Sequence, residues 1–119
     1  MKAADSPAQT WIAYCLNKKG AALVYPFGAD IPVVSVGGKM FASFKDSFMN
    51  VKCDPHKAAE LREQYAEVTP GYYMNKRHWN SIDLTGRLTK EEVAAWIDHS
   101  YELIFQSLKK DVREAIRSL

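Results

Sequence analysis

The segment from Gly71 to Asn80 holds the densest group of side chains that could recognise a ligand. It interleaves cations and amides, which bind phosphate through charge-assisted hydrogen bonds, with aromatic rings, which stack on bases. The relevant members are Tyr72, Tyr73, Asn75, Lys76, Arg77, His78 and Trp79. A structural reading stays open for the same residues, in which the aromatic rings fill the core and the two cations are merely solvated.

Residues that could hold a metal ion do not form a complete set. Cys53 and His56 give one C-x-x-H step, whereas a structural zinc site needs four ligands that usually come as two such pairs. His78 and His99 fit no matching pattern. We therefore expect no metal site and no cofactor, with a buried cysteine and a solvated histidine instead.

Motifs for catalysis are missing from the sequence. It contains no G-x-S-x-G nucleophile elbow, no G-x-G-x-x-G loop and no phosphate-binding P-loop. Ser107 and Lys110 have S-x-x-K spacing without its companion motifs, and Cys15 falls on the inward stripe of a helix. The sequence thus indicates a binding protein rather than an enzyme. A deep cleft that joins His78, Asp83 and a tyrosine would favour an enzyme after all.

The size and composition of the chain are those of one ordinary globular domain. Its 119 residues carry 16 Lys and Arg against 14 Asp and Glu, and a net charge of +2 does not by itself predict a nucleic-acid partner. Two cysteines without an evident partner favour a reduced, cytoplasmic setting. No apolar run approaches the ~18 residues of a membrane span, and the first residues lack the apolar run of a signal peptide. We expect a single cytoplasmic domain spanning residues 1–119, with no membrane contact.

Apolar periodicity, caps and turn residues predict the elements that must position these side chains. Helices are expected from Ser6-Pro7, from Asp54-Pro55, after Thr89 and from about Lys110. Strands are expected at Pro32–Val36, Lys39–Lys45, Phe48–Cys53 and Trp79–Leu84, and a fifth strand near Tyr72 stays open. Residues 21–30 are predicted to form a loop, and residues 68–71 a turn. The order α-β-β-β-α-β-α-α predicts an α+β, two-layer fold in which helices cover one face of an antiparallel sheet.

The hairpin turns assign the strand residues to two faces. A two-residue turn at Asp46-Ser47 pairs Lys45 with Phe48, and side chains alternate along each strand. One face is uniformly apolar and is predicted to be core: Met40, Ala42, Phe44, Met49, Val51 and Cys53. The other face mixes cations with aromatic rings and is predicted to be open to water: Lys39, Phe41, Ser43, Lys45, Phe48, Asn50 and Lys52.

Several stretches of the chain resemble the MmcQ/YjbR family of small bacterial proteins, in the family's order and over nearly the whole length. They are Tyr25–Gly28, Gly37–Phe41, Lys52–Pro55, Leu61–Tyr65, Pro70–Trp79 and Ser100–Leu103, and the most specific part is Asn75–Trp79. The resemblance implies a two-layer α/β fold with an antiparallel sheet, and a double-wing motif that is described as DNA-binding. It implies no catalytic residues. The turn Thr85-Gly86 departs from the Asp-Gly that is frequent in the family.

Two functions from different classes follow. In the first, the protein binds DNA or another nucleic acid: Lys39, Lys45, Lys52, Asn75, Lys76, Arg77 and Arg87 contact phosphates, and His78, Phe41, Phe48, Tyr72, Tyr73 or Trp79 stack on bases. In the second, it is a protein-interaction module or homodimer that uses the open sheet face or a sheet edge, through Val34, Val36, Phe41 and Phe48. The first requires the cations to form one continuous, water-accessible positive surface.

Overall fold

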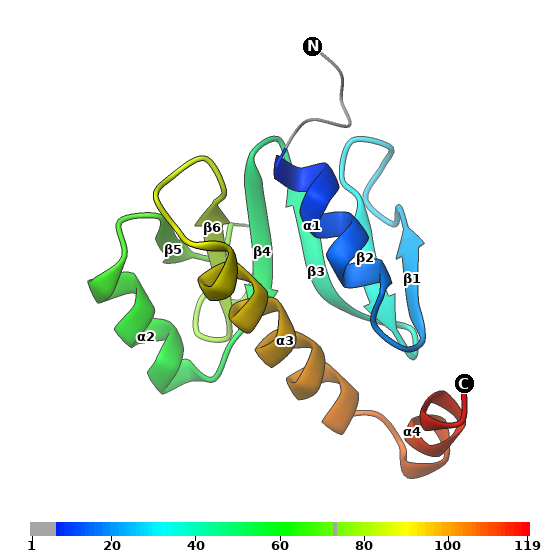
Figure 1. Ribbon diagram of the computed structural model, residues 1–119. Helices are drawn as coiled ribbons and strands as arrows, with labels where there is room; N and C mark the ends of the chain where they lie inside the picture. The colour runs from blue at the N-terminus through cyan, green and yellow to red at the C-terminus, as the bar shows by residue number, and fades with distance from the viewer. Residues whose placement is uncertain (1–6, 73) are drawn as a thin grey trace.

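The computed structural model describes residues 7–72 and 74–119 and shows two layers (Figure 1). One layer is a six-stranded antiparallel sheet in the order β1-β2-β3-β4-β6-β5, and the other consists of helices packed on one face of it. The elements are α1 (Pro7–Leu16), β1 (Ala21–Val24), β2 (Val33–Val36), β3 (Lys39–Lys45), β4 (Phe48–Lys52), α2 (Pro55–Gln64), β5 (Val68–Pro70), β6 (Trp79–Asp83), α3 (Lys90–Gln106) and α4 (Lys110–Arg117). Among the described residues, none of the helices is long and apolar enough to cross a membrane. The predicted α+β class, with helices over one face of the sheet, is confirmed.

Two of the six strands lie in segments that the sequence analysis reads as a loop and a turn. β1 follows Gly20 and pairs with β2 at the sheet edge, where most of its residues are exposed. All four residues of β1 are apolar, so the strand shows no alternation of apolar and polar residues for a sequence pattern to detect. β5 contains Pro70, which lacks an N–H, and the proline is tolerated because β5 forms the opposite edge. The predicted order therefore becomes α-β-β-β-β-α-β-β-α-α.

Turns and caps follow local rules. Gly37 and Gly38 have φ angles of +58° and +82°, as a two-residue hairpin turn requires, and a Cβ on Gly37 would lie 2.6 Å from the side chain of Leu108. The helix expected after Thr89 is α3, and Thr89 forms a capping box with Glu92 at its start. The predicted cap Ser6 lies outside the described residues.

A β-bulge changes the predicted faces of β3. Val34 of β2 pairs with Ala42 of β3. The next residue of β2, Ser35, pairs with Met40, so that Phe41 is an extra residue on β3. An extra residue interrupts the alternation of side chains along a strand. Phe41 and the residues before it therefore lie on faces opposite to those predicted.

As a result, two of the predicted binding residues face the helices. Phe41 is fully buried and makes an edge-to-face contact with Tyr101 of α3, with 5.2 Å between the ring centroids. Lys39 points the same way, and its Nζ lies 3.4 Å from the Ser107 hydroxyl at the end of α3. The prediction that both residues lie on the open face is wrong. The placement of Met40 in the core is wrong as well, because alternation puts this half-buried side chain on the opposite face.

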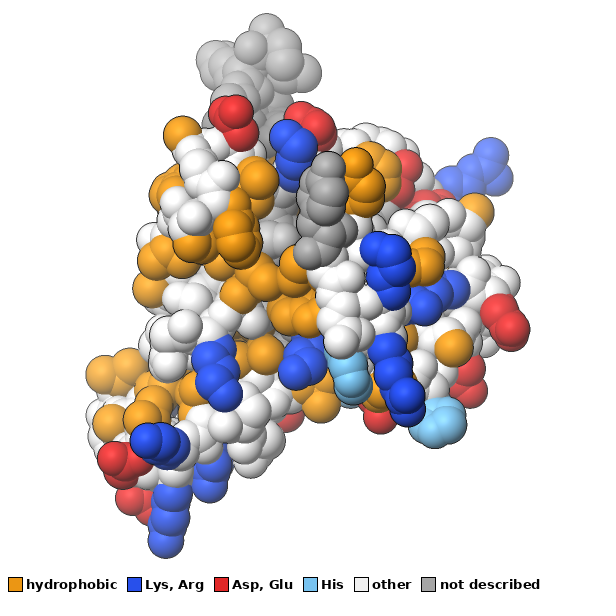
Figure 2. Space-filling model, turned by 180° about the vertical axis from the view of Figure 1, so that it is seen from behind, with side chains coloured by type: hydrophobic (Ala, Val, Ile, Leu, Met, Phe, Trp, Pro, Cys, Tyr) orange, Lys and Arg blue, Asp and Glu red, His pale blue; other side chains and the backbone are white. Residues whose placement is uncertain are grey.

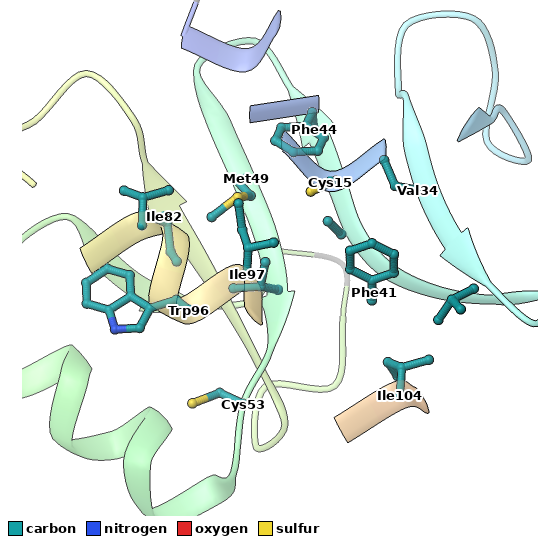
Figure 3. Packing of buried hydrophobic residues seen from close by; sticks show 14 of the residues in the cluster. Cys15, Val34, Phe41, Phe44, Met49, Cys53, Ile82, Trp96, Ile97 and Ile104 are labelled. Atoms are coloured by element: carbon teal, nitrogen blue, oxygen red, sulfur yellow. The ribbon is translucent and has the colours of Figure 1, made fainter. Parts of the chain in front are cut away.

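The core fills the space between the sheet and the helices α1 and α3 (Figure 3). Phe44, Met49 and Ile82 come from three neighbouring strands and are almost fully buried, as is Ile97 of α3. Cys15 of α1 lies in the same core, and burial raises the pKa of its thiol to about 12. This thiol is therefore protonated at neutral pH and acts as packing rather than as a nucleophile.

Candidate functional site

The face of the sheet opposite the helices presents its side chains in rows across the strands, because directly paired residues of an antiparallel sheet share a face. The predicted pairing of Lys45 with Phe48 and of Ser43 with Asn50 is confirmed and sets these rows. The middle row consists of Val33, Ser43, Asn50, Ser81 and Thr69. The flanking rows contain Lys45, Phe48 and Asp83 toward one end of the strands, and Lys52 and Trp79 toward the other.

Hydrogen bonds join the polar side chains of the middle row into a floor. The Asn50 amide donates to the Ser43 hydroxyl at 3.3 Å, and the Ser81 hydroxyl donates to the Asn50 carbonyl oxygen. The backbone N–H of Tyr72 donates to the Ser81 hydroxyl at 2.9 Å. Three neighbouring strands and the segment after β5 are thus tied to one network. Such a network fixes the orientation of the Asn50 amide.

A hollow of about 660 Å³ lies over this floor, and we call it the open-face hollow. Its apolar walls are formed by Phe27, Ile31, Phe48, Pro70, Tyr72 and Met74. Three rings of this wall are open to water, with 60% of Phe27, 62% of Tyr72 and 44% of Phe48 exposed. Ligand sites typically measure roughly 300–1,000 Å³, so the hollow is large enough for a small molecule or one residue of a polymer. Figure 2 shows apolar side chains gathered on this face, with Lys and Arg side chains beside them.

Arg62 of α2 holds the segment 71–80 in place. Its Nε donates to the Asn80 side-chain oxygen at 2.7 Å, and its guanidinium also donates to the carbonyls of Lys76 and Trp79. Asn80 is 1% exposed, so this contact is anchored in the interior. Arg62 is not among the predicted site residues, because nothing in the spacing of α2 marks which of its polar residues reaches a distant loop.

The side chains of the segment 71–80 divide into structural and accessible ones. The Asn75 side chain accepts the backbone N–H of Arg77 at 3.0 Å, and the Lys76 ammonium donates to the carbonyl of Gly71 at 3.2 Å. His78 is half-buried, and Arg77 is exposed. Arg77 is therefore the cation of this segment that is best placed to reach a ligand.

The predicted aromatic residues differ in what they can reach. Phe48 and Tyr72 are exposed around the open-face hollow, Trp79 is half-buried and Phe41 is inaccessible. Tyr73 lies outside the described residues. The third exposed ring of the wall, Phe27, is not among the predicted binding residues, and its part in the wall depends on the fold.

The predicted cations do not form one surface. Lys45 lies at the β3–β4 hairpin, and Arg87 follows β6 at the same end of the sheet. Lys52 lies at the other end of β4, where the segment with Lys76 and Arg77 leads into β6. Four strand positions separate the row of Lys45 from that of Lys52, about 13 Å along the strands. The open-face hollow lies between these two groups.

The two groups of cations differ in their acidic neighbours. At the Lys45 end, hydrogen bonds from Thr85 hold the pKa of the Asp83 carboxyl below its ordinary value, so Asp83 is ionised at neutral pH. The backbone N–H of Arg87 donates to the Glu67 carboxylate at 2.7 Å, which places another acid beside it. Lys52, Lys76 and Arg77 form what we call the basic end. Within residues 7–72 and 74–119, the ion pair that is present joins Lys18, just after α1, to Asp98 of α3. It does not involve the cations of the basic end.

Among the described residues, His78 and Asp83 are not brought together, and neither is a set of metal ligands. His78 and Asp83 flank opposite ends of β6, roughly 16 Å apart along the strand. In the part of the chain that the structure describes, no three His, Cys, Asp or Glu side chains gather closely enough to hold a metal ion. The open face thus combines an apolar wall, a polar floor and a basic end.

Comparison with known proteins places this geometry in a family. The sequence model of the YjbR family matches residues 16–103. The chain is 31% identical over 99 residues to the uncharacterized protein YbdF of Escherichia coli O157:H7, covering 80% of this chain and 81% of YbdF. It is 27% identical over 112 residues to the uncharacterized protein YjbR of Escherichia coli K12, covering 91% and 95% of the two chains.

Two crystal structures share the fold. A Deinococcus radiodurans protein with the domain DUF419 superposes with a TM-score of 0.85 at 24% identity, covering 94% of this chain and 88% of that one. A Pseudomonas syringae protein superposes with a TM-score of 0.71 at 24% identity, covering 81% and 97%. At this identity the likeness shows a common architecture, and the function has to be argued from the site.

Proposed function

This chain belongs to the YjbR family, and we propose that it binds DNA or another nucleic acid on the open face of its sheet, without catalysing a reaction. One observation supports this most. The face without helices combines three solvent-exposed aromatic rings with cations that have no carboxylate within ion-pair distance among the described residues. The double-wing motif implied by the family resemblance belongs to the same proposal.

The aromatic rings supply affinity that does not depend on sequence. Bases stack on exposed aromatic side chains, and every base offers a face for such a contact. Phe27, Phe48 and Tyr72 surround one hollow, so a base that enters it would meet more than one ring. The rings also explain why the face is apolar without being covered by another part of the described chain.

The basic end supplies the contacts to phosphate. Lys52 and Arg77 carry the charge at one side of the open-face hollow, and Lys45 carries it at the other. The cations do not form the single continuous surface that the sequence-based hypothesis required, so the proposal depends on their position at the two ends of the hollow. A strand that crosses the hollow would meet cations before and after its bases. Because the net charge of the chain is only +2, binding depends on this local arrangement and should weaken steeply as salt increases.

The test is the charge reversal Lys52→Glu with Arg77→Glu, measured by fluorescence anisotropy with a labelled oligonucleotide at several salt concentrations. We expect at least a tenfold loss of affinity and a salt slope shallower by about 1.4, since each phosphate contact on a single strand contributes about 0.7. Lys76 is left intact because it supports its own loop.

The matched control is Lys90→Glu with Lys110→Glu, which changes the charge equally at the starts of α3 and α4. An equal loss in this control would mean that net charge alone governs binding. Unchanged binding of the Lys52/Arg77 variant would overturn the proposed surface.

A second candidate function is association through the β1 edge. The contact predicted from Val34, Val36 and Phe41 is wrong, because all three side chains are fully buried. The edge strand β1 instead exposes Leu23 and Val24, by 39% and 38%, beside backbone groups that face no further strand of the described chain. A dimer in sedimentation analysis that persists at high salt and is lost in Leu23→Lys would favour this candidate.

A further inference from the structure

We propose that the open-face hollow accepts one unstacked base of a single strand, so that the protein prefers single-stranded nucleic acid to a duplex of the same sequence. This inference rests on the proposed function and adds the form of the nucleic acid that is recognised. It follows from the shape of the hollow, from the polar groups on its floor and from the position of the cations around it.

The shape of the hollow selects an unpaired base. Its walls rise at the two edges of the sheet, because Phe27 lies in the segment after β1 and Tyr72 in the segment after β5. The two rings therefore enclose the middle row from opposite edges. A base inside a duplex has its faces covered by its neighbours and its pairing edge covered by its partner. Only a base that has left the stack can present its faces to these walls.

The floor of the hollow fits the edge of a base. Ser43 and Ser81 are each 4% exposed and hold Asn50 between them. The Asn50 amide uses one N–H for Ser43, which leaves its second N–H and a lone pair of its oxygen without a partner among the described residues. The Ser43 hydroxyl accepts the bond from Asn50 and keeps its own proton to donate. A purely apolar ligand would leave these groups unsatisfied, whereas a base edge offers both donors and acceptors.

The charges around the hollow fit a strand rather than a detached base. Lys45 lines one end of the hollow together with the acidic Asp46, and Lys52 lies one row beyond its floor at the other end, so the less opposed positive charge is on the Lys52 side. The floor itself carries no charged side chain. This arrangement places a neutral base over the middle row and the flanking phosphates near the cations, as the electrostatics of a strand require.

The experiment compares three probes on the full chain at one salt concentration: a single-stranded oligonucleotide of about ten nucleotides, its duplex, and the free nucleoside monophosphates. We expect the single strand to bind roughly tenfold or more tightly than the duplex, an advantage of the size that stacking one base on an aromatic side chain provides. A single 2-aminopurine in the strand should change its fluorescence on binding, because the base leaves its neighbours.

Two exposed wall residues give the variants, Phe48→Ala and Tyr72→Ala, which should each lower single-strand affinity about tenfold and leave duplex affinity and the salt slope unchanged. Ser43→Ala should lower it about threefold by removing one donor from the floor. The matched control is Tyr25→Ala, because Tyr25 is 49% exposed and does not line the hollow.

The outcomes separate the two proposals. Equal binding of single strand and duplex, with wall variants that behave like Tyr25→Ala, would overturn the base site and leave nucleic-acid binding intact. Failure of every oligonucleotide to bind at low salt would overturn the proposed function itself. Displacement of the strand by a free nucleotide at equal concentration would show that the hollow serves a small ligand, which also overturns this inference.

Discussion

The same strands form both faces of the sheet, but the two faces differ in what covers them and in the size and polarity of their side chains. On the helix-covered face, Phe44, Met49 and Ile82 are paired neighbours that close a dry core. One position along on the open face, the small polar residues Ser43 and Asn50 form the floor of a hollow. The covered face therefore carries the stability of the fold, and the open face is free to carry a ligand. Substitutions on the two faces should separate folding from binding.

The largest expected effect comes from Phe44→Ala on the covered face. Removing a fully buried ring should lower the free energy of unfolding by about 3–5 kcal/mol, because the cavity in a packed core does not collapse. Phe48→Ala, on the open face of the next strand, should lower it by less than about 1 kcal/mol. Urea denaturation of both variants checks the contrast, and equal losses would show that the open face is structural.

A smaller loss is expected from Ser100→Ala, which removes a link between α3 and two strands. The Ser100 hydroxyl donates to the carbonyl of Phe41 at 2.6 Å and accepts the N–H of Lys52 at 2.9 Å. Because both partners become unsatisfied, the free energy of unfolding should fall by about 1–3 kcal/mol. The exposed Ser107→Ala is the matched control, and a denaturation midpoint equal to that of the control would contradict this role.

Arg62→Lys should act locally on the segment 71–80. Lysine keeps the charge but cannot reproduce the several hydrogen bonds of the guanidinium, which are worth about 1.5–3 kcal/mol when one partner is charged. The backbone N–H groups of His78 and Trp79, which bond to the carbonyl of Asn75, should exchange with solvent at least tenfold faster. Arg113→Lys is the control variant and should leave exchange at these amides unchanged. Equal exchange rates in the two variants would contradict the role of Arg62 in fixing this segment.

The smallest effect expected is a pH dependence from His99. Burial, aided by the Lys57 ammonium and opposed by the Asp54 carboxylate, holds the pKa of His99 below its ordinary value near 6.5. The folded state therefore binds its proton at lower pH than the unfolded state does. The contribution of His99 to the free energy of unfolding is therefore complete above the pKa that it has in the unfolded chain. This contribution is lost as pH falls through the lower pKa that it has in the folded chain. Denaturation at pH 7.5 and 5.5 should show a small loss that His99→Gln reduces, and an identical loss in that variant would contradict the assignment.

Features set by neighbouring residues were predictable from the sequence. The glycine hairpin at Gly37-Gly38 and the capping box of Thr89 with Glu92 depend on backbone conformation and side-chain reach within a few positions. The pairing of Lys45 with Phe48 followed from one turn. Such local rules were enough to predict the class of fold and most of the covered face.

Features that depend on distant partners were not predictable. The bulge that buries Phe41 arises from the pairing of β3 with β2, and the edge strand β1 shows no pattern of its own. The open-face hollow forms because Phe27 and Tyr72, from two loops far apart in sequence, both line it. Arg62 likewise acts through a contact with Asn80. Each case requires the fold before the residues can be recognised.

An NMR titration of the isotope-labelled chain with a single-stranded oligonucleotide at low salt would locate the bound strand on one of the two faces. We expect the amide signals of Ser43, Asn50 and Ser81 to move, while those of Trp96 and Ile104 in α3 stay in place. Shifts confined to the helices, or no shifts with the oligonucleotide in excess, would contradict binding on the open face.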